Sequence, residues 1–243
     1  MTGEHGRDGK ENKKNKADRT GKINNAERAK NSICLIISGG SFCDLPREVL
    51  KADYVIACDK GVEYADRYGI EPDILIGDFD SVSGDTLDSI DDRSVPVMRY
   101  PKEKDYTDTF IAVKHALDEG YRELVLVCAM GGRTDHAFAN IQTAHYAAKK
   151  GAIVRIYDVK EEMIVFNNTH VIINEGALRR NMSVFSLDDR CEGVSIKGTK
   201  YELDDAVLTN SFPIGVSNEF KKKQAAISVK KGSLLVIVSD DCL

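Results

Sequence analysis

Short apolar runs alternate with helical patterns along the first half of the chain, which is typical of a parallel sheet with crossover helices. Strands are predicted over 33–37, 54–57, 74–77, 95–98, 124–129 and 153–157. Helices are predicted over 107–119 and 135–150, each followed by a glycine. Thr107 and Thr134 have the hydroxyl expected of helix N-caps. The pattern predicts an α/β unit over residues 31–158, with a mostly parallel, Rossmann-like sheet and flanking helices.

The pattern changes after residue 158 to short strands separated by turns. The apolar runs are MIVF, VII, MSVFSL, GVSI, AISV and SLLVIV. Strands repeating at roughly 8–12 residues are typical of a sandwich or barrel. The sequence therefore predicts an all-β sandwich domain over residues 159–243.

Residues 1–30 contain almost no large apolar side chains, which predicts a disordered leader. They hold nine basic and five acidic residues, so the remaining chain, with 25 basic against 34 acidic, has a net charge of −9. A folded part this acidic is unsuited to neutralising nucleic-acid phosphates. The basic leader is read as a solvated tail in preference to a nucleic-acid arm.

Hydropathy and cysteine usage indicate the cellular environment. No stretch approaches the roughly 18 uncharged apolar residues that cross a bilayer, and the N-terminus lacks an apolar secretion signal. The six cysteines form no C-x-x-C pair, and Cys34, Cys58 and Cys128 lie in apolar runs that favour buried, reduced thiols. These features predict a soluble, cytoplasmic protein that binds neither nucleic acid nor membrane.

Seven aspartates lie near the ends of predicted strands or in the following loops. They are Asp59, Asp73, Asp78, Asp80, Asp105, Asp108 and Asp135. Parallel strands carry these loops to one sheet edge, where open α/β sheets bind ligands. Two like charges about 4 Å apart repel by about 4 kcal/mol at an effective dielectric near 20, so gathered carboxylates need a cation or raised pKa values. Mg²⁺ shared with substrate phosphates is the expected partner.

The segment ILIGDFDSV is the densest acidic element. If it is extended, Asp78 and Asp80 point at one ion while Phe79 turns into the fold. The alternative is a pair of turn-forming aspartates.

The segment MGGRTDH follows a predicted strand and opens a helix. Its glycines allow close approach of a ligand, and the helix start offers N–H groups to an anion. Arg133 has a planar guanidinium that matches phosphate oxygens. The alternative is a Gly-rich turn in which Asp135 stabilises the helix dipole.

The segment KEKDYTD places Lys102 and Lys104 beside carboxylates at the other helix start, where each lysine is either a ligand or a solvated charge. No nucleophile elbow, P-loop or G-x-G-x-x-G motif is present. Phosphoryl transfer needs mainly positioning and charge neutralisation. The residues therefore predict a phosphate and metal site without a recognisable nucleophile.

These segments resemble the thiamine pyrophosphokinase family, whose enzymes move a pyrophosphate from ATP to thiamine. The resemblance covers about residues 33–238. It is carried by Asp59 and by PDILIGDFDS at 72–81, KDYTD at 104–108, GGRTDHAFAN at 131–140 and FPIGVSNEF at 212–220. It implies an α/β nucleotide domain, a C-terminal β-sandwich and a homodimer whose active sites lie between subunits. Lys60 departs from the glycine that relatives commonly have, and the chain has no tryptophan to stack on thiamine.

The resemblance also implies roles for individual residues. Asp78, Asp80 and Asp108 would hold Mg²⁺ and the ATP phosphates, with Asp59 alongside. Lys104, Thr107, Arg133 and Asp135 would line the nucleotide and phosphate site. Ser217 and Asn218 would help hold thiamine, from the partner subunit.

The implied reaction is in-line attack of the thiamine hydroxyl on the β-phosphorus of ATP, which gives thiamine diphosphate and AMP. Asp78, Asp80, Asp108 and Arg133 are the candidate catalytic residues. Lys104 and Arg133 would neutralise developing charge, and either Asp80 or Asp108 would accept the hydroxyl proton.

Two other functions fit parts of the sequence. A strand followed by Asp78-x-Asp80-x-Val82 also resembles the nucleophile motif of haloacid-dehalogenase-like phosphatases, in which Asp78 would be phosphorylated. A nucleotide or thiamine sensor would use the same residue types without turnover. AMP release that depends on thiamine distinguishes the enzyme from both.

Overall fold

The computed structural model describes residues 32–84, 86, 90, 94–101, 103, 105–175 and 180–240. The predicted leader, Lys102 and Lys104 lie outside the described residues. Within this part of the chain, no helix is both long and apolar enough to span a membrane.

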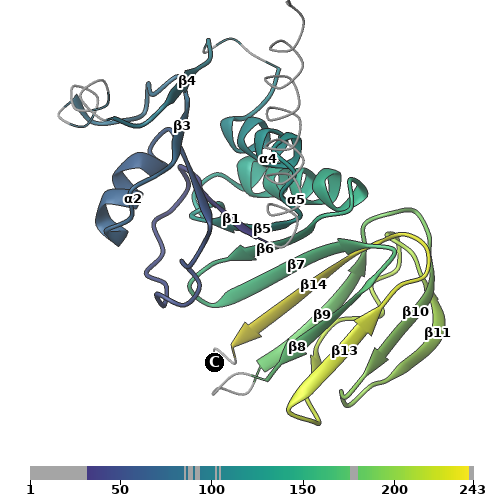
Figure 1. The fold of residues 1–243 in the computed structure, drawn as a ribbon. Helices are drawn as coiled ribbons and strands as arrows, with labels where there is room; N and C mark the ends of the chain where they lie inside the picture. Colours follow the sequence, from purple (N-terminus) through teal and green to yellow (C-terminus); the bar gives the residue numbers. More distant parts are fainter. Residues whose placement is uncertain are drawn as a thin grey trace, which may run out of the picture.

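The predicted order of an α/β unit followed by an all-β sandwich is confirmed (Figure 1). The first half contains β1 (Ile33–Ile37), β2 (Tyr54–Cys58), α2 (Gly61–Tyr68), β3 (Ile74–Gly77), β4 (Val97–Arg99), α4 (Asp108–Asp118), β5 (Glu123–Val127), α5 (Thr134–Lys149) and β6 (Ile153–Tyr157). The second half contains β7 (Glu161–Asn167), β8 (His170–Asn174), β9 (Arg180–Ser186), β10 (Cys191–Lys197), β11 (Leu203–Leu208), β12 (Asn218–Glu219), β13 (Gln224–Ser228) and β14 (Ser233–Asp240). Strands β11 and β12 were not among the apolar runs, because both are largely polar or exposed.

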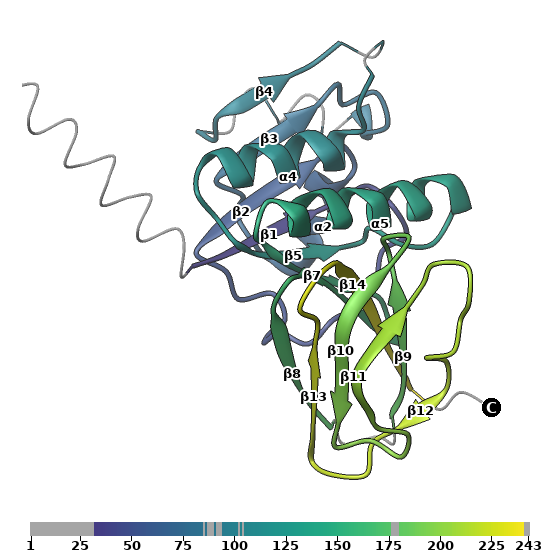
Figure 2. The same cartoon turned by 90° about the vertical axis from the view of Figure 1, so that its right-hand side faces the viewer.

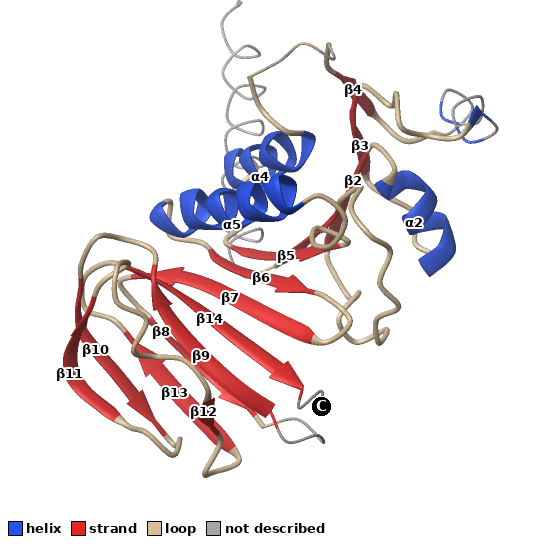
Figure 3. Ribbon diagram, turned by 180° about the vertical axis from the view of Figure 1, so that it is seen from behind, coloured by secondary structure: helices blue, strands red, loops and turns tan. Residues whose placement is uncertain are grey.

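The strands of the first half run parallel in the order β4-β3-β2-β1-β5-β6. Alternate residues of β1 face opposite layers: Cys34 and Ile36 pack toward α4 and α5, and Leu35 and Ile37 toward α2. Figure 3 shows these helices on the two sides of the sheet. The strand order reverses between β1 and β5, and such a switch point is where doubly wound sheets bind ligands.

The parallel sheet continues into the sandwich. Strand β6 pairs antiparallel with β7, with Ile156 opposite Met163, and β14, β9 and β12 extend the same sheet to ten strands. A four-stranded sheet, β11-β10-β13-β8, packs against this extension over a second apolar core that includes Phe166 and Val194. The two halves of the chain are therefore joined by hydrogen-bonded strands.

The helix termini test two predicted caps. Thr107 is the N-cap of α4, and its hydroxyl accepts a hydrogen bond from the Phe110 N–H at 3.2 Å, as predicted. The cap predicted at Thr134 is wrong, because Arg133 is the N-cap of α5 and Thr134 is its first helical residue. Arg133 makes no side-chain cap hydrogen bond. The start of α5 therefore lacks the hydroxyl acceptor found at α4.

Candidate active site

Asp59 lies at the carboxyl end of β2 and reaches across to the end of β3. Its Oδ1 accepts a hydrogen bond from the Phe79 N–H at 3.1 Å, and its own N–H donates to the Ile76 carbonyl at 3.2 Å. Gly77 adopts φ +152°, and a Cβ there would lie 2.0 Å from Asp59 Oδ1. The absent side chain of Gly77 thus makes the space that the Asp59 carboxyl occupies.

The Asp59 carboxyl also meets Asp108, the first residue of α4. Burial, a side-chain hydrogen bond with Asp108 and the charges of Asp108 and Asp78 raise the pKa of Asp59 to about 7. The Cys58 thiol lies 3.8 Å from the Asp108 carbonyl, which ties the start of α4 to the end of β2. The predicted gathering of acidic loops is confirmed for these aspartates.

Asp78 and Asp80 are arranged differently from the extended pattern that was expected. Phe79 is buried as predicted, but it adopts φ +61°, so the segment turns at this residue. Asp78 Oδ1 accepts a hydrogen bond from the Asp80 N–H at 3.0 Å, which is an Asx turn. Among the described residues, no three histidine, cysteine or acidic side chains are grouped to hold a metal. The expectation that Asp78, Asp80 and Asp108 hold one metal ion therefore stays a prediction, and the contact that the structure shows among these acids is the one between Asp59 and Asp108.

Asp73 and Asp105 are two further members of the predicted aspartate group. Asp73 precedes β3 and accepts a hydrogen bond from the Val55 N–H at 2.7 Å, near the start of β2. It therefore lies at the opposite end of the parallel strands, so its inclusion was wrong. Asp105 is exposed in the loop before Thr107.

The loop between β5 and α5 presents an exposed ion pair. Gly131 and Gly132 adopt φ of +76° and +68°, which brings the chain sharply to the helix start. The Arg133 guanidinium donates to both Asp135 carboxyl oxygens, at 3.1 and 2.6 Å. This contact holds the pKa of Asp135 below its usual range. The side chains of Arg133 and Asp135 remain 72% and 63% exposed, so the guanidinium is oriented and accessible.

A second Gly-rich loop, SGGS directly after β1, supports this ion-pair loop and was missed by the sequence analysis. The Gly40 N–H donates to the Cys128 carbonyl at 2.8 Å and the Ser41 N–H to the Met130 carbonyl at 3.1 Å. A Cβ at Gly40 would lie 2.6 Å from the Cys128 oxygen, so the close approach requires glycine. Two glycines at the end of the first apolar strand were the available signal.

Asn140 on α5 was likewise not singled out. Its side chain is buried and donates to the Ala129 carbonyl at 2.6 Å. This contact fixes α5 to the end of β5. Asn140 shares the buried face of α5 with the small residues Thr143, Ala144 and Ala147, so a polar amide at this spacing was the available sequence signal.

Ser217 and Asn218 lie on the sandwich, away from the carboxyl pair. Figure 2 shows β12 at the opposite end of the molecule from β3 and β4. Asn218 Nδ2 donates to Thr199 Oγ1 at 3.1 Å and to the Tyr201 carbonyl at 2.8 Å. Its Oδ1 accepts from the Tyr201 and Glu219 N–H groups, both at 3.0 Å. The amide is thus engaged within the protein, whereas the neighbouring Ser217 is exposed.

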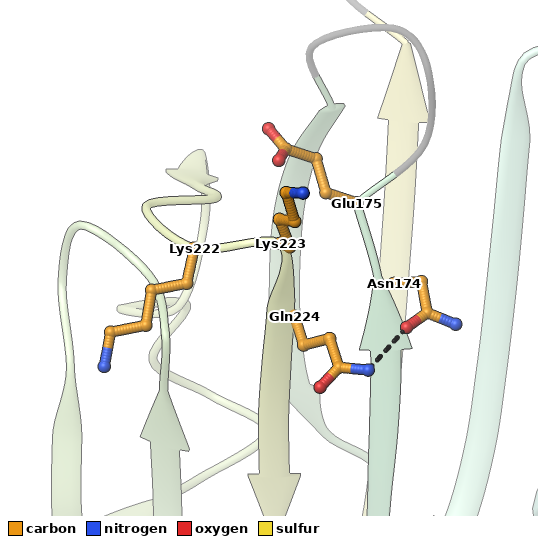
Figure 4. A pocket seen from close by; sticks show the side chains of 5 residues that line it. All are labelled: Asn174, Glu175, Lys222, Lys223 and Gln224. Atoms are coloured by element: carbon orange, nitrogen blue, oxygen red, sulfur yellow. Dashed lines mark hydrogen bonds between the residues drawn. The ribbon is translucent and has the colours of Figure 1, made fainter.

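An open hollow lies between β8 and β13 on the sandwich (Figure 4). It is lined by Asn174, Glu175, Lys222, Lys223 and Gln224. The Gln224 amide donates to Asn174 Oδ1 at 2.9 Å across it. None of these side chains belongs to the predicted site.

Comparisons with known proteins match both halves of the chain. Residues 45–156 match the thiamin pyrophosphokinase catalytic domain, and residues 169–234 match its vitamin B1 binding domain. Thiamine pyrophosphokinase of Bacillus subtilis is 28% identical over 186 residues, which cover 76% of this chain and 87% of the relative.

Solved structures agree with these matches. The crystal structure of the Bacillus subtilis enzyme has a TM-score of 0.77 at 25% identity, covering 86% of this chain and all of that one. Thiamin pyrophosphokinase from Candida albicans, at 14% identity, shares the fold with a TM-score of 0.72, covering 90% of this chain and 91% of that one. The chain belongs to the thiamine pyrophosphokinase family, and it is an enzyme of thiamine diphosphate formation.

Proposed function

We propose that this enzyme transfers the pyrophosphoryl group of ATP to the hydroxyl of thiamine and releases AMP. The observation that carries the proposal is the Asp59–Asp108 carboxyl pair, which lies beside Asp78 where the parallel strands end. A pair of acids that disfavour each other's ionisation fits a site completed by a cation and a polyphosphate.

The donor chemistry of this pair fits Mg²⁺. Carboxylate oxygens are hard ligands, and Mg²⁺ commonly takes one or two of them while substrate phosphates complete its coordination. Asp78, Asp80 and Asp108 are the proposed ligands, with Asp59 alongside, hydrogen-bonded to Asp108. Bound there, the ion would neutralise phosphate charge.

Cationic and backbone groups would bind the phosphates from the other side of the sheet's switch point. Arg133 is held by Asp135 with its guanidinium exposed, and the start of α5 presents backbone N–H groups. Lys104 and Thr107 are proposed to line the nucleotide site at the start of α4. Thr107 would act chiefly by capping the helix that carries Asp108. Asp80, which is exposed, is the proposed acceptor of the hydroxyl proton.

A homodimer would complete the site. Ser217, proposed to contact thiamine, directly precedes β12, which lies at the opposite end of the molecule from β3 and β4 (Figure 2). A second copy would bring Ser217 and the carboxyl pair together. The loop before it exposes Phe212, Ile214 and Val216 by 66%, 51% and 48%. Exposed apolar clusters mark interaction surfaces. The five cysteines in the described part of the chain form no disulfide, which supports a reducing compartment such as the cytoplasm.

The test is to incubate the protein with Mg²⁺, ATP and thiamine and to quantify AMP and thiamine diphosphate. Equal amounts of both products, formed only with thiamine present, are expected. Asp80→Asn should lower turnover by about 10²-fold or more while leaving the fold intact. Asp118→Asn, on the exposed surface of α4, is the matched control and should remain active.

The competing outcomes are distinct. Thiamine binding without AMP would indicate a sensor, and a trapped phospho-aspartate at Asp78 would indicate phosphatase chemistry. Either result, or normal turnover in Asp80→Asn, contradicts the proposal.

A further inference from the structure

Cys43 and Cys128 bring two buried thiols together from different loops. Their sulfur atoms are 3.9 Å apart, and both residues are 1% exposed. Cys43 belongs to the loop after β1, and Cys128 directly follows β5. Tyr68 of α2 lies against both, with its Oη 3.3 Å from Cys128 Sγ and 3.8 Å from Cys43 Sγ. Its hydroxyl also donates to the Cys43 carbonyl.

The two thiols differ in acidity. The hydrogen bond with Cys128 is the main cause that lowers the pKa of Cys43, whereas that of Cys128 is raised. A thiolate is the nucleophilic form of cysteine, so Cys43 is the more reactive member of the pair. Cys34 differs, because burial raises the pKa of its thiol to well above the ordinary value.

Access to this pair depends on the loop after β1. Cys43 lies between the exposed residues Ser41 and Asp44, in a segment without regular secondary structure up to Arg47. Such segments open locally at a fraction of the free energy of global unfolding. A small oxidant could thus reach the Cys43 sulfur without unfolding of the sheet.

We propose that Cys43 and Cys128 form a reversible dithiol–disulfide pair that responds to hydrogen peroxide and controls the ion-pair loop of the active site. Cys43 attacks the peroxide, which gives a sulfenic acid and one water. The Cys128 thiol then attacks the Cys43 sulfur, forming the disulfide and releasing a second water. The two thiols lose two electrons and two protons in total, and the peroxide is reduced to two waters.

A disulfide would disturb the support of Arg133. An S–S bond is about 2.05 Å long, so the sulfurs must approach by nearly half of their present separation. The backbone leading to Cys43 is hydrogen-bonded to Cys128 and Met130 through Gly40 and Ser41. A Cβ at Gly131 would lie only 2.6 Å from Ser41 Oγ, so Ser41 packs closely against the backbone of Gly131. Movement of the Cys43 segment is therefore transmitted to the loop that presents Arg133.

The first test measures the bond itself and does not depend on the proposed function. The full-length protein is treated with hydrogen peroxide, remaining thiols are alkylated, and the protein is digested and mapped by mass spectrometry. A peptide pair linked through Cys43 and Cys128, lighter by two hydrogens and absent after dithiothreitol, is expected. Stable sulfinic acid at Cys43, or linkage of Cys43 to another cysteine in its place, overturns the proposal.

The second test measures AMP formation and rests on the proposed function. Oxidised wild-type protein should lose most of its activity and regain it on reduction. Cys43→Ala and Cys128→Ala should keep their activity under peroxide, and Cys34→Ala, the matched buried control, should respond like the wild type. Cys43→Ser is the second variant if Cys43→Ala does not fold. A linked peptide with unchanged activity would overturn the control of the active site, and peroxide inactivation of Cys43→Ala would assign the effect to another group.

Discussion

Gly77 and Asp59 share one small volume at the ends of β3 and β2: a Cβ on Gly77 would lie 2.0 Å from Asp59 Oδ1. The Asp59 carboxyl uses that space to reach the Phe79 N–H and the Asp108 carboxyl. The glycine in the GDFD segment is therefore required by the acid on the neighbouring strand.

Replacing Gly77 with alanine should displace the Asp59 carboxyl and strain the backbone at φ +152°. We expect the free energy of unfolding to fall by about 1–3 kcal/mol and AMP formation to fall with it. Urea unfolding and product assays measure the two effects. Gly84→Ala is the control, since nothing lies within 4 Å of a Cβ there. Equal stability of the two variants would show that Gly77 is not needed for this geometry.

The raised pKa of Asp59 makes stability depend on pH. Its value of about 7 in the folded protein, against 3.8 ordinarily, means that between these values the folded state holds a proton that the unfolded state has lost. The contribution of Asp59 to stability is thus present below about pH 4 and is lost as the pH rises toward 7. Urea unfolding at pH 5 and pH 8, with a metal chelator present, measures it.

Asp59→Asn removes this titration while keeping the side-chain size. The variant should lose less stability than the wild type between pH 5 and pH 8, and Mg²⁺ should stabilise the wild type more than the variant at pH 8. Asp118→Asn, an exposed acid on α4, should retain the wild-type pH dependence. Identical pH profiles for Asp59→Asn and the wild type would contradict the assigned role of the carboxyl pair.

Arg133 should matter for turnover and little for stability. Its ion pair with Asp135 is exposed, and such pairs contribute little to folding. Arg133→Gln should reduce kcat by about 10²-fold, since one charge-stabilising donor is lost, with an unchanged unfolding midpoint. Arg190→Gln removes a comparable exposed pair with Glu192 on the sandwich and should keep full turnover. A similar loss of turnover in both variants would contradict a specific role of Arg133 in the reaction.

Local features of the fold were predictable because their causes lie within a few residues. The apolar run around Ile36 specifies a buried strand, and Thr107 followed by Asp108 specifies a helix start. The burial of Phe79 was also predicted correctly, although the extended backbone assumed for that prediction is replaced by a turn. The pattern of short strands also indicated the sandwich, whereas the polar strand β11 carried no such signal.

Contacts between distant segments could not be read from spacing. The Asp59–Asp108 pair depends on the register of β2 and β3 and on where α4 begins, none of which the sequence states directly. Asp73 was misplaced because a residue just before a short strand lies at the opposite sheet edge from one just after it. The backbone turn at Phe79 also involves a residue distant in sequence, because the Phe79 N–H donates a hydrogen bond to Asp59. The extended segment assumed from the sequence did not include this contact.

Asn218 gives a prediction that separates positioning from direct binding of thiamine. Its buried amide makes four hydrogen bonds, three with Thr199 and Tyr201 and one with the Glu219 N–H. Asn218→Ala removes these four hydrogen bonds and should lower the free energy of unfolding by about 1–3 kcal/mol. If Asn218 acts by placing Ser217, KM for thiamine should rise together with that loss of stability.

The matched comparisons are Ser217→Ala and Asn210→Ala. Ser217 is exposed, so Ser217→Ala should raise KM for thiamine with stability retained. Asn210, whose exposed amide donates to Asp189 at 3.0 Å, should affect neither quantity by much when replaced. Full stability in Asn218→Ala together with a raised KM would instead mean that the amide contacts thiamine itself. The hydrogen bonds of Asn218 with Thr199 and Tyr201 would then have to break when thiamine binds.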